Sequence, residues 1–431
     1  MEKKVAFYTL GCKLNYAETE SIARRFSEAG FLRVEFSQSA DYYIINTCSV
    51  TEVANKKSRN IIRKALKKNV HAKVVVVGCY AQLKPQEIIS IAGVSLVLGA
   101  HDKFKIIEKL QELEEGTLQS AVSSCEISNV SNFENSYSLN ERTRSFLKVQ
   151  DGCNYNCSYC TIPQARGASR NATIATIVQQ AREIAQSGIR EIVLTGINIG
   201  DFGRTTNEKF LDLLKALDAV AEIKRYRISS IEPNLLTSEI IDFVVQSRAF
   251  MPHFHIPLQS GCDEVLRLMR RRYTTDFFAQ KIQEIKQKIP YAGIGVDVIV
   301  GTNGETEEYF QKTYSFLKSL PISYLHVFTY SERENTDALA IEPCIPEHER
   351  RQRNLVLHEL SEEFSTQFTR QCAGQIRPIL FEMKQKNGAF VGYSDNYIRV
   401  QSIAAGIEKN TVVPLQLSVN NGECWGFYAH L

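Results

Sequence analysis

The chain has 431 residues and a formal net charge of +3 at pH 7. This length allows two or three domains with separate cores, and so small a charge does not by itself identify a polyanion partner. The first residues lead directly into an apolar strand, and no run of about eighteen apolar residues occurs. We therefore expect a cytoplasmic protein without a membrane span.

Residues 5–99 repeat one kind of unit, in which a short apolar strand is followed by a turn of small residues and an amphipathic helix. Continuous β-branched strands that alternate with helices indicate an open parallel α/β sheet. The expected strands are 5–10, 42–45 and 74–77, and the expected helices are 16–29, 52–67 and 85–92.

Each of these strands ends close to a cysteine, and we call Cys12, Cys48 and Cys79 the strand-end trio. A single cysteine is more often a core residue than a ligand. Ligands in open α/β sheets lie beyond the carboxyl ends of the strands, so three thiols at that position would converge. Eleven cysteines in a reducing compartment also favour metal binding over disulfides. We expect the strand-end trio to hold an iron–sulfur cluster.

Periodicity weakens after residue 99, and residues 120–138 are rich in Ser and Asn, as is typical of a linker. Cys125 lies there without an evident partner, and we interpret it as a spare thiol. The expected domains are 1–120, a linker at 121–138, 139–370 and 371–431.

A second α/β series follows the linker, and its alternation suggests a partial (β/α)6 barrel with an active site at the carboxyl ends of the strands. The expected strands are 146–150, 191–194, 226–229, 254–258, 295–300 and 324–329.

The loop after the first of these strands contains Cys153, Cys157 and Cys160, which we call the loop trio. Thiolates at this spacing fit three corners of a 4Fe-4S cube and leave the fourth iron open. A ferredoxin cluster or a zinc site normally takes four protein ligands. The spacing therefore favours a cluster that carries out a reaction.

The loop resembles that of the radical S-adenosylmethionine (SAM) enzymes, including an aromatic residue, Tyr159, before the third cysteine. In that family SAM chelates the open iron and is cleaved to a 5′-deoxyadenosyl radical. The resemblance and the later strand ends suggest SAM contacts at Tyr159, Thr195, Gly196, Asn198, Ser229, Glu232, Gln259, Arg270, Val298 and Tyr330. His253 and His255 lack a third ligand nearby and are interpreted as packing or supporting residues.

Residues 371–431 contain short strands at 378–382, 389–393, 397–400 and 412–415, which suggest a small β-barrel. Tyr393 and Tyr397 are candidate platforms for RNA bases. Basic runs that would neutralise phosphates are Arg267, Arg270, Arg271 and Arg272, and Lys56, Lys57, Arg59, Arg63, Lys64, Lys67 and Lys68. The second run is equally compatible with a solvated helix face.

Three segments, TLGCKLN at 9–15, NTCSVT at 46–51 and GCYAQ at 78–82, resemble the cysteine motifs of the methylthiotransferase amino-terminal domain. That family joins such a domain to a radical SAM domain and a small carboxyl-terminal β-barrel, the TRAM domain, and the likeness covers nearly the whole chain. Lys13, Leu14 and Glu18 look most like the branch that modifies threonylcarbamoyladenosine in tRNA. The isopentenyladenosine branch usually has Gln-Met after the cysteine, and the ribosomal-protein branch usually has Pro-Lys.

The resemblance implies methylthiolation of C2 of N6-threonylcarbamoyladenosine at tRNA position 37, with two SAM molecules and two 4Fe-4S clusters. The strand-end trio would carry the sulfur, and the loop trio would cleave SAM. The implied partners are the tRNA anticodon loop and an electron donor such as flavodoxin or ferredoxin; the sulfur donor is unknown, and we expect a monomer. Two alternatives are the same chemistry on isopentenyladenosine tRNA or a ribosomal protein side chain, and a non-catalytic RNA-binding protein stabilised by zinc.

Overall fold

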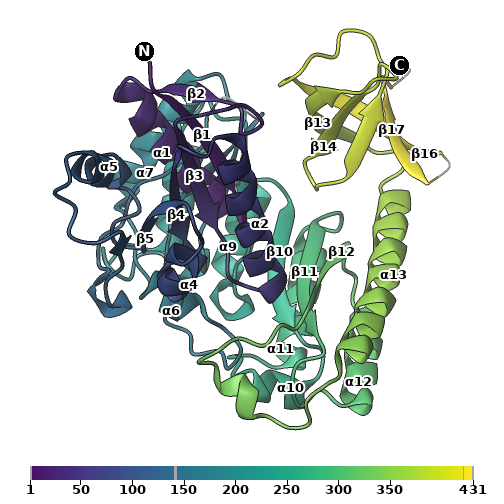
Figure 1. The fold of residues 1–431 in the computed structure, drawn as a ribbon. Helices are drawn as coiled ribbons and strands as arrows, with labels where there is room; N and C mark the ends of the chain where they lie inside the picture. The colour runs from purple at the N-terminus through teal and green to yellow at the C-terminus, as the bar shows by residue number, and fades with distance from the viewer. Residues whose placement is uncertain (1, 140–142, 421, 430–431) are drawn as a thin grey trace.

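The computed structural model describes residues 2–139, 143–420 and 422–429. An amino-terminal sheet, a central array of parallel strands and a small carboxyl-terminal barrel follow one another along the chain (Figure 1). Helix α13 (Glu347–Gln371) leads from the central array to the carboxyl-terminal barrel. Among the described residues, no helix is both long enough and apolar enough to cross a membrane.

Parallel strands form the amino-terminal sheet in the order β2-β1-β3-β4-β5-β6, which confirms the open parallel α/β domain. Strands β3 and β4 are almost entirely buried, as their continuous apolar runs predict. The bounds are β1 Lys4–Thr9, β2 Leu32–Val34, β3 Tyr42–Thr47, β4 Lys73–Gly78, β5 Val94–Leu98 and β6 Val122–Ser123.

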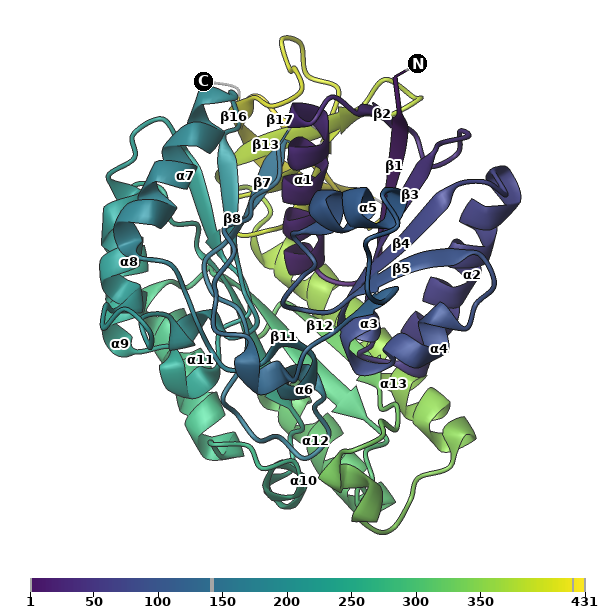
Figure 2. The ribbon, with the colours of Figure 1, turned by 60° about the vertical axis from the view of Figure 1, so that its left-hand side comes forward.

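Helices cover both faces of this sheet (Figure 2). Phe26 of α1 belongs to one apolar cluster with Ile44, and Ile62 of α2 belongs to the opposite cluster with Tyr43. The bounds are α1 Lys13–Glu28, α2 Glu52–Lys68, α3 Cys79–Leu83, α4 Pro85–Ile89 and α5 Ile106–Glu114.

The central array consists of the parallel runs β7-β8-β9 and β10-β11-β12. Isolated bridges from Tyr226 to Phe250 and from Ser230 to His255 connect β9 with β10, so the two runs form one curved wall and confirm the partial (β/α)6 barrel. The bounds are β7 Arg144–Lys148, β8 Glu191–Thr195, β9 Arg225–Ile228, β10 His253–Gln259, β11 Gly293–Val300 and β12 Tyr324–Thr329.

Helices flank the outer side of the central array (Figure 2). A threonine side chain caps the first turn of α7, α9, α11 and α12, which explains why these helices begin where they do. The bounds are α6 Ile162–Arg166, α7 Ile174–Gln186, α8 Phe210–Asp218, α9 Ser238–Gln246, α10 Asp263–Leu268, α11 Thr275–Lys288 and α12 Glu307–Ser319, with short 3₁₀ turns η2 Ile199–Asp201, η3 Pro233–Leu235 and η4 Asp337–Ala340.

The carboxyl-terminal strands close into a barrel in the order β13-β14-β15-β17-β16, as expected for this region. Strand β17 was not among the predicted strands; it follows a turn at Gly422 and completes the closure. Tyr397 was expected in a strand, but it lies in the turn before β15 with φ 74°. The bounds are β13 Ile376–Lys384, β14 Phe390–Ser394, β15 Arg399–Ser402, β16 Val412–Asn420 and β17 Glu423–Phe427.

The expected linker at 121–138 is attached to both neighbouring parts. Strand β6 extends the amino-terminal sheet, η1 (Ile127–Asn129) follows it, and Tyr137 bridges to Leu147 of β7. The domain limits given above remain a prediction.

A buried ionic cluster attaches the carboxyl-terminal barrel to the central array. Glu191 pairs with Arg225 at 2.7 Å and with Arg227 at 3.0 Å. Both guanidinium groups donate to the carbonyl oxygen of Ser394, at 2.8 and 2.7 Å, and Arg227 also donates to Asp395. Because all three charged side chains are buried, each depends on the others for compensation.

We expect Glu191→Gln to destabilise the protein by about 3–5 kcal/mol, because it leaves two buried guanidinium groups without their carboxylate. The free energy of unfolding from urea titration measures this loss. Glu347→Gln is the matched control, since Glu347 pairs with Arg351 on the exposed surface of α13, and its unfolding midpoint should stay close to that of the wild type. Equal midpoints for the two variants would contradict the role of Glu191.

Candidate active site

The carboxyl ends of β1, β3 and β4 lie level, so the strand-end trio emerges at one edge of the amino-terminal sheet. Thr9 pairs with Asn46 across β1 and β3, and Thr47 pairs with Gly78 across β3 and β4. The register of the sheet therefore brings together cysteines that are far apart in the sequence.

Gly11, directly before Cys12, leaves the space that the Cys48 side chain occupies. A Cβ atom at Gly11 would lie 2.8 Å from Cβ of Cys48 and 3.2 Å from its Sγ, and the φ of +105° already favours glycine. The Asn15 amide donates to the carbonyl oxygens of Leu10 and Thr47, at 2.9 and 3.1 Å, and so ties the two strand ends together.

Burial, and next the neighbouring Cys79, raise the pKa of the Cys48 thiol to about 12. Burial also raises the pKa of Cys79, whereas the Arg166 guanidinium lowers it. Thiols of this kind release their protons when a metal binds them as thiolates. Cys48 and Cys79 are thus suited to a metal ligand role and poorly suited to be free nucleophiles.

Each sulfur of the loop trio accepts a hydrogen bond. Backbone N–H groups of Tyr155 and Ile162 donate to the sulfurs of Cys153 and Cys160, both at 3.4 Å. A guanidinium nitrogen of Arg271 donates to the sulfur of Cys157 at 3.2 Å. Such donors favour the thiolate, although burial raises the pKa of Cys153 to about 11 and of Cys160 to about 12.

Arg271 contacts the loop trio. Its neighbour Arg270 is the predicted SAM contact, and that role remains a prediction. Arg270 has φ 58° and pairs with Asp337 at the surface. The side chain of Arg271 is buried and pairs with Glu232 in addition to Cys157. The left-handed conformation of Arg270 turns the chain after α10, so the next side chain points inward.

The donor set of each trio fits an iron–sulfur cube. In the described part of the chain, no three His, Cys, Asp or Glu side chains converge on a point suited to one metal ion. A cube does not require such convergence, because each thiolate binds a different iron. Three thiols alone also leave one iron of the cube open to another ligand.

The predicted SAM contacts Thr195, Gly196 and Ser229 line one cavity at the carboxyl ends of β8 and β9. A Cβ at Gly196 would lie 3.0 Å from the Gln150 carbonyl oxygen, so the backbone is closely packed there. Asn198 is buried, and neither polar atom of its side chain has a hydrogen-bond partner among the described residues. Such an unpaired amide fits a polar cofactor.

The remaining predicted contacts lie at other strand ends or against the loop. Gln259 has φ 71° beside a bulge at the end of β10, and Val298 is buried within β11. The buried hydroxyl of Tyr330 has no hydrogen-bond partner among the described residues. Tyr159 packs on the apolar cluster of Cys262, Val265 and Met269.

The cavity has a volume of about 510 Å³ and is lined by all three parts of the chain. Cys12 and Lys13 enter it from the amino-terminal sheet, and Tyr397 enters it from the carboxyl-terminal barrel. The strands of the central array supply most of the wall, including Thr195 and Ser229. A cysteine of the strand-end trio and the predicted SAM contacts therefore share one space.

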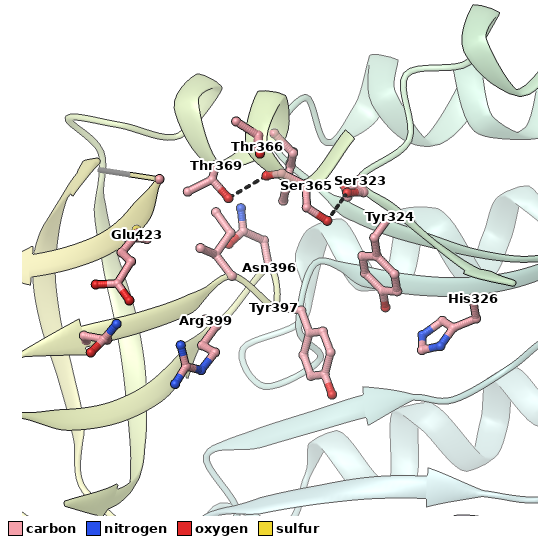
Figure 3. Close-up of a pocket in the computed structure, with 15 residues that line it drawn as sticks. Ser323, Tyr324, His326, Ser365, Thr366, Thr369, Asn396, Tyr397, Arg399 and Glu423 are labelled. Atoms are coloured by element: carbon pink, nitrogen blue, oxygen red, sulfur yellow. Dashed lines mark hydrogen bonds between the residues drawn. The ribbon is translucent and has the colours of Figure 1, made fainter. Parts of the chain in front are cut away.

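A second pocket, of about 480 Å³, adjoins this cavity between α13 and the carboxyl-terminal barrel. Tyr324, His326 and Tyr397 line both (Figure 3). On the side of α13, the Ser365 hydroxyl donates to the Ser323 carbonyl oxygen. The shared aromatic residues thus form the partition between the two spaces.

Tyr393 and Tyr397, which the sequence analysis offered as RNA platforms, pack on protein groups. Their rings stack with centroids 4.9 Å apart, and Tyr397 also stacks on His253 at 4.4 Å. The guanidinium of Arg144 lies over Tyr393 and that of Arg227 over Tyr397. His253 therefore has the expected packing role, and the RNA role of the two tyrosines remains a prediction.

His255 lies in the wall of the cavity and packs on other side chains there. Its Nε2 lies 2.5 Å from Asp297, and its ring stacks on His326 at 4.9 Å.

In the basic helix α2, Arg59 pairs with Glu52 and Glu87. The positive charge of Arg59 is therefore partly neutralised by carboxylates of the amino-terminal domain.

A buried ionic network joins the amino-terminal sheet to the loop trio. Glu18 of α1 pairs with Lys103 at 2.6 Å, with Lys148 at 3.1 Å and with Arg166 at 3.1 Å. Asp151, at the start of the loop, pairs with the same Lys148 and Arg166, at 2.7 and 2.9 Å. Of the residues in this network, only Glu18 was singled out from the sequence, because it follows the first cysteine motif.

Two family models match the chain. Residues 4–99 match the model described as Uncharacterized protein family UPF0004, and residues 147–317 match the Radical SAM superfamily. The first match contains the strand-end trio, and the second contains the loop trio.

Curated relatives match nearly the whole chain. Threonylcarbamoyladenosine tRNA methylthiotransferase MtaB of Bacillus subtilis (strain 168) is 41% identical, over 92% of this chain and 89% of its own length. A tRNA-2-methylthio-N(6)-dimethylallyladenosine synthase of Alkaliphilus oremlandii (strain OhILAs) is 31% identical, over 89% of this chain and 83% of its own length.

Among solved structures, the radical S-adenosylmethionine methyltransferase TsrM of Kitasatospora setae has a similar fold. The TM-score is 0.58 at 13% identity, over 76% of this chain and 73% of that chain. The identity to the curated relatives, the two family models and the arrangement of the two cysteine trios agree. The chain belongs to the radical SAM methylthiotransferase family.

Proposed function

We propose that this protein attaches a methylthio group to C2 of N6-threonylcarbamoyladenosine at tRNA position 37, beside the anticodon. The observation that carries this proposal is the shared cavity, which is lined by Cys12 on one side and by Thr195, Gly196 and Ser229 on another. A reaction that joins a sulfur group to a carbon needs the sulfur-carrying site at the strand-end trio and the SAM site at the strand ends to face the same substrate.

The choice of substrate is supported by the degree of relatedness. The chain is 41% identical to a relative named for threonylcarbamoyladenosine and 31% identical to one named for dimethylallyladenosine. The residues around Cys12, with Lys13 directly after it, also resemble the branch that modifies threonylcarbamoyladenosine.

When bound, the two 4Fe-4S clusters and SAM supply a carbon radical and a methylthio sulfur, which side chains do not provide. The loop trio would hold one cluster and the strand-end trio the other. Arg271, Tyr155 and Ile162 would stabilise the thiolates of the loop by the hydrogen bonds that they donate. The protein's own part is to hold both trios and to exclude water.

The polar groups at the strand ends would orient SAM. Asn198 has an unpaired side-chain amide, and Gly196 permits a close approach of the backbone. Glu232 acts through Arg271, with which it pairs. These roles follow from position at the carboxyl ends of the strands, where ligands of this fold bind.

The partners of this activity are tRNA, through its anticodon loop, and a one-electron donor such as flavodoxin or ferredoxin. The carboxyl-terminal barrel would contribute to RNA binding, since small barrels of this kind bind single-stranded or looped RNA. We also propose that the protein acts in the cytoplasm as a monomer.

A strain that lacks the gene should lose the methylthio form of threonylcarbamoyladenosine from its tRNA and accumulate the unmethylthiolated form. Mass spectrometry of nucleosides from bulk tRNA measures both. The wild-type gene and a Cys344→Ala variant, which changes an exposed thiol outside both trios, should restore the modification, and Cys157→Ala should not. An unchanged methylthio level in the deletion strain, or loss of the methylthio form of isopentenyladenosine instead, would reject this substrate.

Anaerobic reconstitution should give about eight irons per chain for the wild type, and about four for Cys157→Ala, which removes a ligand of the loop trio only. The variant should lose SAM cleavage, measured as 5′-deoxyadenosine, but keep the strand-end cluster. Cys344→Ala should match the wild type in both measurements. Zinc without sulfide would support the non-catalytic alternative, and retained cleavage in Cys157→Ala would refute the role of the loop.

The two neighbouring arginines allow a paired test of the loop geometry. Arg271→Met should weaken retention of the loop cluster about 10-fold, because it removes the donor to Cys157. Arg270→Met should have little effect on the cluster, since Arg270 pairs with Asp337 at the surface. The readout is the chelator concentration that removes half of the cluster absorbance; the reverse order would contradict the role of Arg271.

A further inference from the structure

Lys13 stands out among the charged residues that line the cavity. It directly follows Cys12, and water reaches its side chain. No carboxylate in the described part of the chain forms an ion pair or a hydrogen bond with it, and Asp297 acts on it only through space. Lys13 therefore presents an ammonium group to the cavity without a protein counter-ion.

The two other cations of the wall already have partners. Arg144 pairs with Glu382 at 2.6 Å, and Arg227 pairs with Glu191 at 3.0 Å. Both arginines also lie against the ring of Tyr397. Contacts with the carboxyl-terminal barrel fix the positions of both arginines. Lys13 is therefore the cation of the described cavity wall whose N–H donors remain available to a ligand.

The rest of the lining suits an anion with hydroxyl groups. Among the described residues that line the cavity there is no Asp or Glu. Ser229 and Ser230 supply hydroxyl groups, and the imidazoles of His255 and His326 supply flat surfaces. An anionic ligand would therefore meet attraction from Lys13 and no repulsion from a neighbouring carboxylate of the wall.

The substrate named above carries such an anion. The threonyl group attached through the carbamoyl to N6 ends in a free carboxylate and a hydroxyl, whereas a dimethylallyl group at the same position is a hydrocarbon. C2 and the N6 substituent extend from the same six-membered ring. A group that holds the substituent beside Cys12 would therefore also direct C2 toward the strand-end trio.

We propose that Lys13 forms a carboxylate-binding subsite, which recognises the threonyl carboxylate of the substrate and distinguishes it from neutral N6 substituents. This inference rests on the proposed function, because it assigns one residue to one group of that substrate. A charged hydrogen bond in a partly dehydrated cavity changes affinity by about 10- to 100-fold.

The test compares two anticodon stem–loop RNAs that differ in one group. One carries threonylcarbamoyladenosine with its free carboxylate, and the other carries the same nucleoside with the carboxylate converted to a primary amide. With the cluster-loaded wild type, kcat/KM for methylthiolation should be about 10- to 100-fold higher for the carboxylate RNA, with most of the difference in KM.

Lys13→Gln should remove this preference, so that both RNAs react with similar kcat/KM. Lys13→Arg should keep part of it, because the positive charge is retained, and this rescue separates recognition of charge from a merely structural role. Lys215→Gln, the same change on the outer helix α8, should keep the full preference.

The inference is overturned if the wild type uses both RNAs equally, or if Lys13→Gln retains the preference. Equal use of both RNAs by the wild type overturns the inference even if the variants fold poorly, and Lys13→Arg gives a second variant that tests the residue itself. If the loaded wild type methylthiolates neither RNA, the proposed function itself fails, and the subsite falls with it. Equal use of both RNAs instead leaves the proposed function intact and removes only the subsite.

Discussion

The buried carboxylate of Glu18 is the contact on which the arrangement of the two cysteine trios depends. Glu18 lies on the helix that begins after Cys12, and it pairs with Lys148 of β7 and with Arg166 behind the loop trio. Burial by itself raises the pKa of Glu18, but Arg166, Lys103 and Lys148 outweigh it, so the pKa is lowered and the group stays ionised. Removing one member of such a network leaves the others as uncompensated buried charges.

Buried ion pairs contribute little net stability compared with well-packed apolar residues, so their value here lies in geometry. Apolar packing also joins α1 to β7, through Ala17 and Phe146, but such packing tolerates small rotations, whereas Glu18 must meet three cations at once. Arg166 also donates to the Asn15 side chain at 2.5 Å, and Asn15 ties the ends of β1 and β3. The same contacts therefore hold the strand ends of the strand-end trio relative to one another. They also hold that trio relative to the loop trio.

The sequence predicted the elements well because strand ends and cysteines carry local signals. Each expected strand of the central array overlaps an observed one, and the cysteines follow their strands as expected. The ionic networks left almost no such signal, because a lone Glu18 or Lys148 in the sequence looks like an ordinary surface residue. Their partners lie in other elements, so pairing is decided by the tertiary fold.

Local backbone geometry explains the remaining differences. Arg270 and Arg271 are equivalent in composition, but Arg270 takes φ 58° in a turn that closes α10, with Arg271 N–H bonded to the Leu266 carbonyl. Tyr397 takes φ 74° and so leaves the strand that the apolar pattern predicts. A left-handed residue other than glycine has a weak sequence signature, and in both cases it redirects a side chain of the candidate site.

The carboxyl-terminal barrel adds a further constraint on the cavity. Its Tyr397 ring lies between His253 and the guanidinium of Arg227, so these groups stabilise one another at the cavity wall. Because Arg144 and Arg227 are neutralised by Glu382 and Glu191, the docked barrel leaves Lys13 as the unpaired cation. A barrel that shifted would take Glu382 of β13 away from Arg144 and change the charge that a substrate meets, whereas Glu191 of β8 would stay with Arg227. The position of the carboxyl-terminal barrel and the electrostatics of the cavity are therefore coupled through the same side chains.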